Sequence, residues 1–473
     1  MKLYTEENNY KLYEGNMLDL ESVIEPNSID AIVTDPPYEL GFMNKKWDSS
    51  GIAFQKETWE KCYNVLKPGG HMLVFGGART FYRIACAIED AGFEIRDTIM
   101  WLYGSGFCKG MNIGLAIDKR NGVESEIVGY TNETMPDFND IGVKQKEISG
   151  INKLTFGQVD SGERKEQPIY KAQNEWNGWN TQLKPAYEPI IVARKPCEDS
   201  ILENIEIYGV GGINADECRI AHNEPIKTTN RKQKEGDVFN TDSCGFDNTK
   251  NHLASADSRG RFPSNIILTY DDSDFDEVCG GMPNSDKPNG SVTKSTYKNS
   301  LGSNGIYGHY SENQPLWESY NDSGSASRYF YCAKATTKDR EDGLNLFKAQ
   351  KVNDGRQTPI DNGFQRGETL RKNIHPTVKP CELMQYLIRL ITPKNGVVLD
   401  PFNGSGSTGK ACMWENKERE VNYKYIGIEL TPEYLPISKA RIDYVINAKS
   451  VEQLKTKPQT GKGNLLKLAK EHK

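Results

Sequence analysis

Residues 397–409, VVLDPFNGSGSTG, decide the fold that this sequence predicts. Three apolar residues and an aspartate, typical of a buried strand, lead into a turn that holds Gly404, Gly406 and Gly409, and a helical pattern follows to about Trp414. A strand, a glycine turn and a helix in direct succession begin a βα unit, and such units build parallel sheets covered by helices. The stretch therefore predicts an α/β fold.

The same alternation occupies both ends of the chain. Apolar runs bounded by turn residues predict seven strands, over residues 10–17, 29–34, 71–75, 93–102, 187–193, 397–400 and 425–429. Amphipathic spacing predicts helices over residues 56–66, 79–91, 383–391 and 432–446, besides the one after the glycine turn. This pattern indicates a mostly parallel sheet of seven strands with helices on both faces.

Two segments interrupt the alternation. Residues 120–184 are polar and poorly periodic, and we interpret them as an insertion. Residues 195–328 are rich in Asn, Ser, Asp, Gly and Lys and hold only short apolar runs such as 266–268. An irregular stretch of that length is expected to be functional or partly disordered. Apart from the insertion, the chain divides into residues 1–194, 195–328, 329–448 and a lysine-rich tail, 449–473.

Composition and charge exclude some classes of protein. No stretch approaches the roughly 18 apolar residues of a membrane helix, and the N-terminus lacks the apolar segment of a signal peptide, so we expect a cytoplasmic protein without membrane contact. The ten cysteines are scattered with no C-x-x-C pair, and no metal site is expected. The net charge of −6 does not mark a nucleic-acid binder, but DNA responds to local potential. Basic side chains do cluster, in the tail and at Lys227, Arg231, Lys232 and Lys234.

The tetrapeptide Asp35-Pro36-Pro37-Tyr38 follows the strand predicted over 29–34. Its prolines stiffen the turn, so the Asp35 carboxylate and the Pro36 carbonyl can be held as two acceptors that face one point. Two such acceptors suit an exocyclic amine, because they localise the nitrogen lone pair that the ring otherwise delocalises. Tyr38 offers an aromatic face on which an extruded base can stack. The alternative is a proline-rich strand exit with a packing tyrosine. On this reasoning alone, asparagine at position 35 would still offer one acceptor.

The glycine turn is compatible with three kinds of ligand. Its glycines match the G-x-G-x-x-G pattern of nicotinamide-dinucleotide sites, with Glu429 at about the expected distance. The turn also resembles a phosphate-binding loop, but Ala411 stands where a magnesium-binding Ser or Thr is needed. Asp400 would repel a pyrophosphate but suits a cationic amine, and S-adenosylmethionine carries such an amine and no phosphate. We therefore favour that cofactor, with Glu429 placed to accept both ribose hydroxyls.

A third motif, HPTVKP at residues 375–380, leads into the helix predicted over 383–391. Thr377 and Lys379 are candidates to bind the carboxylate of the cofactor. We interpret His375 as a structural hydrogen-bond partner, because a lone histidine has that role more often than that of a base.

These three motifs, in this order, resemble the N4/N6 amino DNA methyltransferases of the β class. The fold of that class is circularly permuted, so that a catalytic motif of the DPPY type precedes the cofactor motif. The resemblance covers residues 10–105, 185–220 and 325–446. It implies a Rossmann-like methyltransferase sheet that is entered partway through its usual strand order. It also implies that residues 1–194 form the catalytic half, 195–328 a target-recognition region and 329–448 the cofactor-binding half.

The resemblance also assigns site residues. Those that hold the flipped base belong to the DPPY motif, Asp35, Pro36, Pro37 and Tyr38, with Trp101 or Tyr103 as a wall of the base pocket. Those that line the cofactor pocket are Asp400, Phe402, Gly404, Gly406, Glu429, Thr377, Lys379 and Asn16. Asn16 departs from the aspartate usual at its position.

We therefore expect a site-specific enzyme that flips a base of double-stranded DNA and methylates adenine N6 with S-adenosylmethionine. Methylation of cytosine N4 is the nearest alternative, because the members that act on cytosine more often carry serine in place of Asp35. An alternative of another class is a nicotinamide-dependent oxidoreductase, which leaves the Asp35 turn unexplained. A third is a DNA-binding protein with a relic pocket, against which the intact motifs argue. The sequence leaves open whether the chain forms a homodimer and whether a cognate restriction endonuclease accompanies it.

Overall fold

The computed structural model describes residues 1–7, 9–40, 46–103, 110–130, 168–220, 229–230, 253–254, 260–270, 284–285, 324–325, 330–334, 337–352 and 369–455. The predicted basic cluster at Lys227, Arg231, Lys232 and Lys234 lies outside these residues, as do the tail beyond residue 455 and most of residues 195–328.

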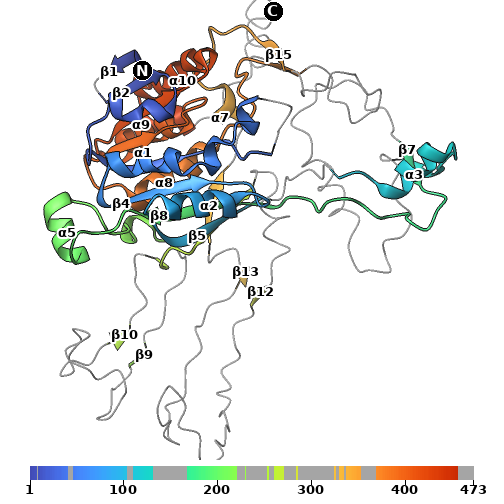
Figure 1. The fold of residues 1–473 in the computed structure, drawn as a ribbon, viewed down its shortest axis with the longest axis horizontal. Coiled ribbons are helices and arrows are strands. Elements are labelled where there is room, and N and C mark those ends of the chain that lie inside the picture. The colour runs from blue at the N-terminus through green and yellow to red at the C-terminus, as the bar shows by residue number, and fades with distance from the viewer. Residues whose placement is uncertain are drawn as a thin grey trace, which may run out of the picture.

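Within the described residues, one central sheet holds ten strands (Figure 1). Their order across the sheet is β1 (Lys2–Glu7), β2 (Tyr10–Glu14), β18 (Lys424–Glu429), β17 (Val397–Asp400), β3 (Ile29–Thr34), β4 (Leu66–Phe75), β8 (Tyr187–Arg194), β5 (Glu94–Tyr103), β11 (Ile266–Tyr270) and β14 (Tyr331–Lys334). Neighbouring strands pair in parallel except at three places, where β1 meets β2 and where β8 meets β4 and β5. The result is a mostly parallel α/β sheet.

The seven predicted strands are present and form the uninterrupted run from β2 to β5. Three strands that we did not predict extend the described sheet at its edges: β1, β11 and β14. The β11 strand pairs in parallel with both β5 and β14. Residues 195–328, in which we predicted no strand of the sheet, therefore contribute one. Only the three apolar residues 266–268 stand out in this strand, and its partners β5 and β14 are distant in sequence.

Some boundaries also differ from the prediction. The β4 strand begins at Leu66, five residues early, because the KPGG segment is hydrogen-bonded to the residue after β8: Gly69 donates its N–H to the Lys195 carbonyl and Gly70 accepts from Lys195 N–H. The helix after the glycine turn, α9, spans Ser407–Arg419 and so outlasts the predicted end at Trp414.

Helices cover both faces of the sheet. On one face lie α8 (Cys381–Ile391), α9 and α10 (Leu435–Asn447), and on the other lie α1 (Lys56–Val65), α2 (Phe81–Asp90) and the 3-10 helix η1 (Met17–Ser22). Successive residues of β3 point to opposite faces, with Ala31 and Val33 in the first core and Ile32 in the second. Burial on both sides explains why the strands read as continuous apolar runs.

The described part of the 120–184 insertion is more regular than predicted. Strands β6 (Glu126–Tyr130) and β7 (Pro168–Lys171) pair antiparallel beside α3 (Ile113–Asn121). Figure 1 shows α3 and β7 well to one side of the sheet.

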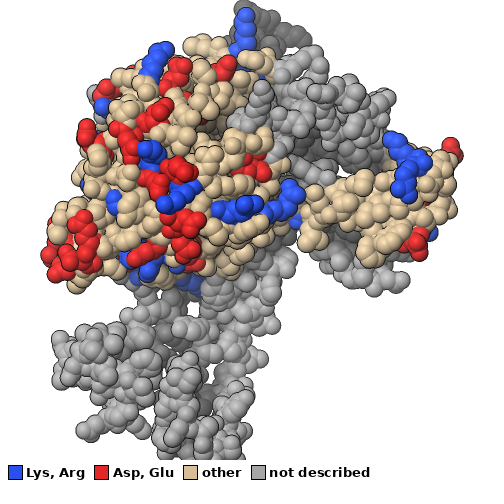
Figure 2. Space-filling model, viewed as in Figure 1, with Lys and Arg blue, Asp and Glu red and all other residues tan. Residues whose placement is uncertain are grey.

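Figure 2 shows acidic side chains gathered over α5 (Ile201–Tyr208), whereas acidic and basic side chains are mixed over the region of the sheet and its helices. In the described part of the chain, no helix is long and apolar enough to span a membrane.

Candidate active site

A cavity of about 1450 Å³ opens at the carboxyl ends of β18, β17 and β3, three strands that are neighbours in the sheet. Ligands of open α/β sheets bind at this edge. The predicted site residues that line the cavity are Asn16, Asp35, Pro36, Pro37, Tyr38, Thr377, Lys379, Asp400, Phe402, Gly404 and Glu429, joined by Trp101 and Tyr103. Gly406 does not line it.

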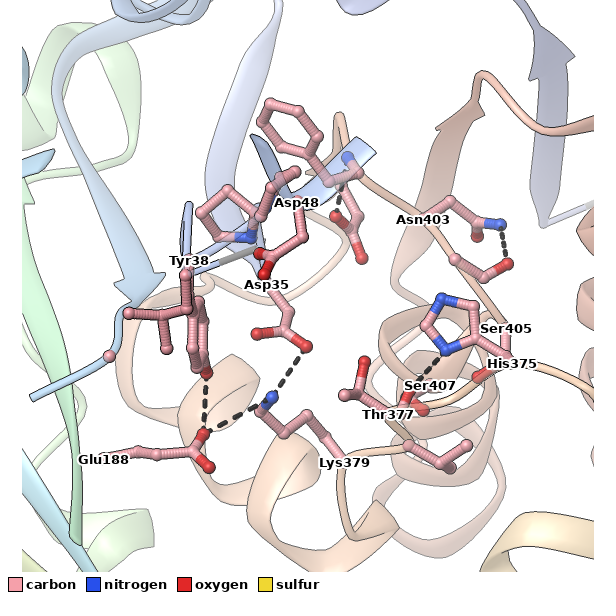
Figure 3. A pocket seen from close by; sticks show the side chains of 18 of the residues that line it. Asp35, Tyr38, Asp48, Glu188, His375, Thr377, Lys379, Asn403, Ser405 and Ser407 are labelled. Carbon is pink, nitrogen blue, oxygen red and sulfur yellow. Dashed lines mark hydrogen bonds and ion pairs between the residues drawn. The ribbon is translucent and has the colours of Figure 1, made fainter. Parts of the chain in front are cut away.

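The Asp35 turn leaves the end of β3 and enters the cavity wall (Figure 3). The Oδ2 atom of Asp35 accepts a hydrogen bond from Lys379 Nζ at 2.7 Å. Its Oδ1 atom is buried and has no hydrogen-bond partner among the described residues. Since buried carboxylate oxygens are almost always paired, this atom is an acceptor available to a donor that enters the cavity.

Tyr38 is fixed at both ends. Its hydroxyl donates to Glu188 Oε2 at 2.6 Å, and its carbonyl accepts from the Thr80 hydroxyl at 2.8 Å. Burial, followed by the charges of Asp35 and Glu188, raises the pKa of Tyr38 well above its ordinary value, so the hydroxyl stays protonated. An aromatic ring held in this way suits a planar ligand.

Lys379 of the HPTVKP motif lies on the Asp35 side of the cavity. Besides its bond to Asp35, its ammonium lies 3.5 Å from Glu188 Oε2. Burial by itself lowers the pKa of Lys379, but the two carboxylates outweigh that effect and raise it. Lys379 is therefore charged, and its nearest partner is the carboxylate of Asp35.

Asp400 joins the glycine turn to the sheet. Its Oδ1 accepts from the Thr34 hydroxyl at 2.7 Å and from Phe402 N–H at 3.1 Å, and its Oδ2 accepts from the Thr408 hydroxyl at 2.7 Å. Burial raises the pKa of Asp400 to about 6. The carboxylate lines the cavity but also holds three segments together, a role that the sequence did not indicate.

Glu429 is held against the glycine turn. Its Oε2 accepts from Gly404 N–H at 2.6 Å and its Oε1 from Thr431 N–H at 2.8 Å. Burial raises its pKa to about 7. Each oxygen keeps further acceptor capacity, so the ionised carboxylate can still receive two hydroxyl donors.

The two motif glycines have different surroundings. Gly404 has φ +51°, and a Cβ there would lie 2.8 Å from His375 Nε2 inside the cavity wall. Gly406 has φ +74° and is the N-cap of α9, where a Cβ would collide with Ser438 of α10. Its absent side chain thus allows α9 and α10 to approach closely, so its structural role is helix packing.

His375 and Asn16 act mainly on the backbone around them. The Nδ1 atom of His375 lies 2.5 Å from the Thr377 carbonyl oxygen, and burial lowers its pKa to about 4, so the ring is neutral. This geometry agrees with a structural role. Asn16 Oδ1 accepts from Leu18 N–H at 3.1 Å and caps η1, which leaves its amide N–H₂ as the group available to a ligand.

Sequence reasoning missed Glu188. It is the second residue of β8, which runs antiparallel to β4 and β5, so the start of β8 lies at the edge where the parallel strands end. An acidic residue at the start of an apolar strand was the available signal, but only the direction of β8 gives it meaning. The residues just before β8, such as Thr181 and Leu183, also line the cavity.

The fold and the cavity define an α/β protein with a cavity at the carboxyl edge of its sheet, lined by the Asp35 turn on one side and the glycine turn on the other. Residues 29–440 match the model of the DNA methylase family that comprises the N6 and N4 enzymes. The match spans most of the chain, which therefore belongs to this family of DNA methyltransferases. The membership removes the nicotinamide-dependent oxidoreductase from consideration.

Two relatives in sequence agree with the family. The type II methyltransferase M2.LlaDCHI of Lactococcus lactis subsp. cremoris is 28% identical over 244 residues, which are 45% of this chain and 83% of that protein. The DNA adenine methyltransferase YhdJ of Escherichia coli (strain K12) is 36% identical over 93 residues, 20% of this chain and 29% of that protein. The solved M1.HpyAVI–SAM complex has 14% identity and a TM-score of 0.32, with coverage of 92% of this chain and 99% of that chain.

Proposed function

We propose that this protein transfers the methyl group of S-adenosylmethionine to adenine N6 in double-stranded DNA, and that the target base is flipped into the cavity. The observation that carries the proposal is the buried, unpaired Oδ1 of Asp35 beside the ring of Tyr38. An exocyclic amine supplies the missing donor, and the ring supplies a stacking surface for its base.

The cofactor side fits S-adenosylmethionine in its donors and charges. Glu429 would accept the ribose hydroxyls, the neighbouring Gly404 leaves room because it has no Cβ, and Asn16 offers an amide N–H₂ to the adenine. Asp35, Glu188 and Lys379 together carry one net negative charge, which suits a ligand with a sulfonium centre. When bound, the cofactor supplies an electrophilic methyl group. The chain's own part is to hold and orient the amine that receives it.

Asp35 acts on the target as a hydrogen-bond acceptor. Its Oδ2 pairs with the Lys379 ammonium at 2.7 Å, which leaves Oδ1 to accept from the amine. Together with the Pro36 carbonyl it would localise the lone pair of the nitrogen. These groups are fixed before the substrate arrives, which is the condition under which polar groups stabilise a transition state most.

Three features support adenine as the target and the β class as the subgroup. Position 35 carries aspartate, whereas relatives that act on cytosine N4 more often carry serine there. The Asp35 turn precedes the glycine turn in the chain, which is the order of the β class. Among the relatives, YhdJ is described as an adenine methyltransferase.

The test is an analysis of nucleosides from DNA that the purified protein has treated with S-adenosylmethionine. We expect N6-methyladenine by mass spectrometry, and methylation-sensitive sequencing of the same DNA gives the recognition site. N4-methylcytosine in its place would overturn the choice of base. No methylated nucleoside in any DNA tested, with cofactor binding intact, would overturn the activity. Sedimentation of the protein alone and with DNA addresses the homodimer, and a neighbouring nuclease gene would support a restriction partner.

A further inference from the structure

Glu188 lines the cavity and belongs to a cluster of four polar side chains, with Tyr38, Lys379 and Asp35 (Figure 3). One of its oxygens, Oε2, accepts the Tyr38 hydroxyl at 2.6 Å and lies 3.5 Å from the ammonium of Lys379. The ammonium in turn binds Asp35 at 2.7 Å. Glu188 thereby connects the ring that would stack on the base to the carboxylate that would accept from its amine.

The hydroxyl contact decides how the Tyr38 ring can lie. The Tyr38 carbonyl is held by the hydroxyl of Thr80, at the entrance to α2. With the backbone and the hydroxyl both fixed, the ring has one orientation. Without Glu188 the hydroxyl loses the acceptor that lies 2.6 Å from it, and the ring is held less firmly.

The neighbouring charge explains why Glu188 can serve as that acceptor. A carboxylate in a cavity needs a compensating cation, and Lys379 is shared between Glu188 and Asp35. The side chain of Glu188 is still 21% exposed, so it borders the space into which a base would enter.

We infer that Glu188 is a positioning residue for methyl transfer: through its bond to the Tyr38 hydroxyl it holds the ring on which the target base stacks. The inference rests on the proposed function. Glu188 need not touch the base, the cofactor or the reacting atoms, and its effect passes through Tyr38.

The experiment compares Glu188→Ala, Glu188→Gln and a control, Glu94→Gln. The glutamine oxygen can occupy the position of Oε2 and keep the bond to Tyr38, while its amide nitrogen takes the place of Oε1. The control removes a carboxylate of β5 that lies away from the cavity and pairs with Arg194, the last residue of β8. The single-turnover rate of methyl transfer, the cofactor affinity and the DNA affinity are measured for each full-length variant.

We expect the transfer rate of Glu188→Ala to fall about tenfold or more, with both affinities within about threefold of wild type. Glu188→Gln and Glu94→Gln should stay within about threefold. In a Tyr38→Phe background, which lacks the hydroxyl, Glu188→Ala should cause little further loss, because the two groups act as one unit.

Several results would overturn the inference. They are a Glu188→Ala rate within threefold of wild type, a Glu188→Gln variant as slow as the alanine variant, and full additivity with Tyr38→Phe. If wild type transfers methyl groups to DNA and one of these results is found, the inference alone fails. If wild type transfers none, the proposed function fails first.

Discussion

Asp35→Asn is the substitution for which the structure and the sequence predict the most different activities. By sequence reasoning, the amide oxygen would replace one carboxylate oxygen and keep part of the activity. In the structure, Lys379 Nζ lies 2.7 Å from Asp35 Oδ2. An amide N–H₂ cannot face that ammonium, so the amide oxygen must turn toward Lys379, and the N–H₂ then occupies the position of Oδ1.

In this orientation the amide N–H₂ faces the target amine, so a donor stands where an acceptor is needed. Removal of one preorganised group of this kind lowers kcat by roughly 10²–10³, or about 2.7–4 kcal/mol. We therefore expect Asp35→Asn to be nearly as slow as Asp35→Ala. Adding Lys379→Met to Asp35→Asn frees the amide to rotate, so the double variant should recover about tenfold over Asp35→Asn alone.

The assay is single-turnover transfer of a labelled methyl group at saturating DNA and cofactor. Calorimetry with S-adenosylmethionine serves as the control, and cofactor affinity should change by no more than about threefold. An Asp35→Asn rate within tenfold of wild type would refute the orientation that we assign to the amide. A wild-type rate for Asp35→Ala would refute the role of Asp35 altogether.

Three further predictions follow from the site. Burial raises the pKa of Glu429 to about 7, and only its ionised form can accept both ribose hydroxyls. The affinity for S-adenosylmethionine, measured by calorimetry, should therefore be about tenfold weaker at pH 6 than at pH 8. An affinity that does not change with pH would remove Glu429 from the ribose site. Gly404→Ala should weaken cofactor binding, because its Cβ would clash with the His375 ring. Gly406→Ala should lower the melting temperature, because its Cβ would clash with Ser438 of α10, and the protein that still folds should bind the cofactor about as well as wild type. The reverse pattern would exchange the roles of the two glycines. An exchange of residues 271–329 with those of a relative leaves the β11 strand intact. It should change the DNA sequence that is methylated and keep N6-methyladenine as the product. If the recognised sequence stays the same, recognition lies elsewhere, and the insertion at 120–184 is the next candidate.

The sequence by itself determined the fold class and the two motifs that line the cavity, the DPPY turn and the glycine turn. The seven strands from β2 to β5 lie inside a sheet with two buried faces, so each reads as an apolar run that local pattern reveals. The DPPY turn and the glycine turn are contiguous in sequence, and their stiffness and small residues are local properties. For this reason their place at the cavity could be predicted.

The tertiary structure alone decided which side chains meet. The bond between Lys379 and Asp35 joins residues 344 positions apart, and it places the ammonium of the HPTVKP motif beside the carboxylate of the DPPY turn. The role of Glu188 depends on β8 running antiparallel to its neighbours, a choice that the composition of the strand does not encode. Gly406 matches its motif as well as Gly404 does, yet the packing of α10 turns its open side away from the cavity. Pattern is local, whereas contact and burial depend on partners that only the folded chain brings together.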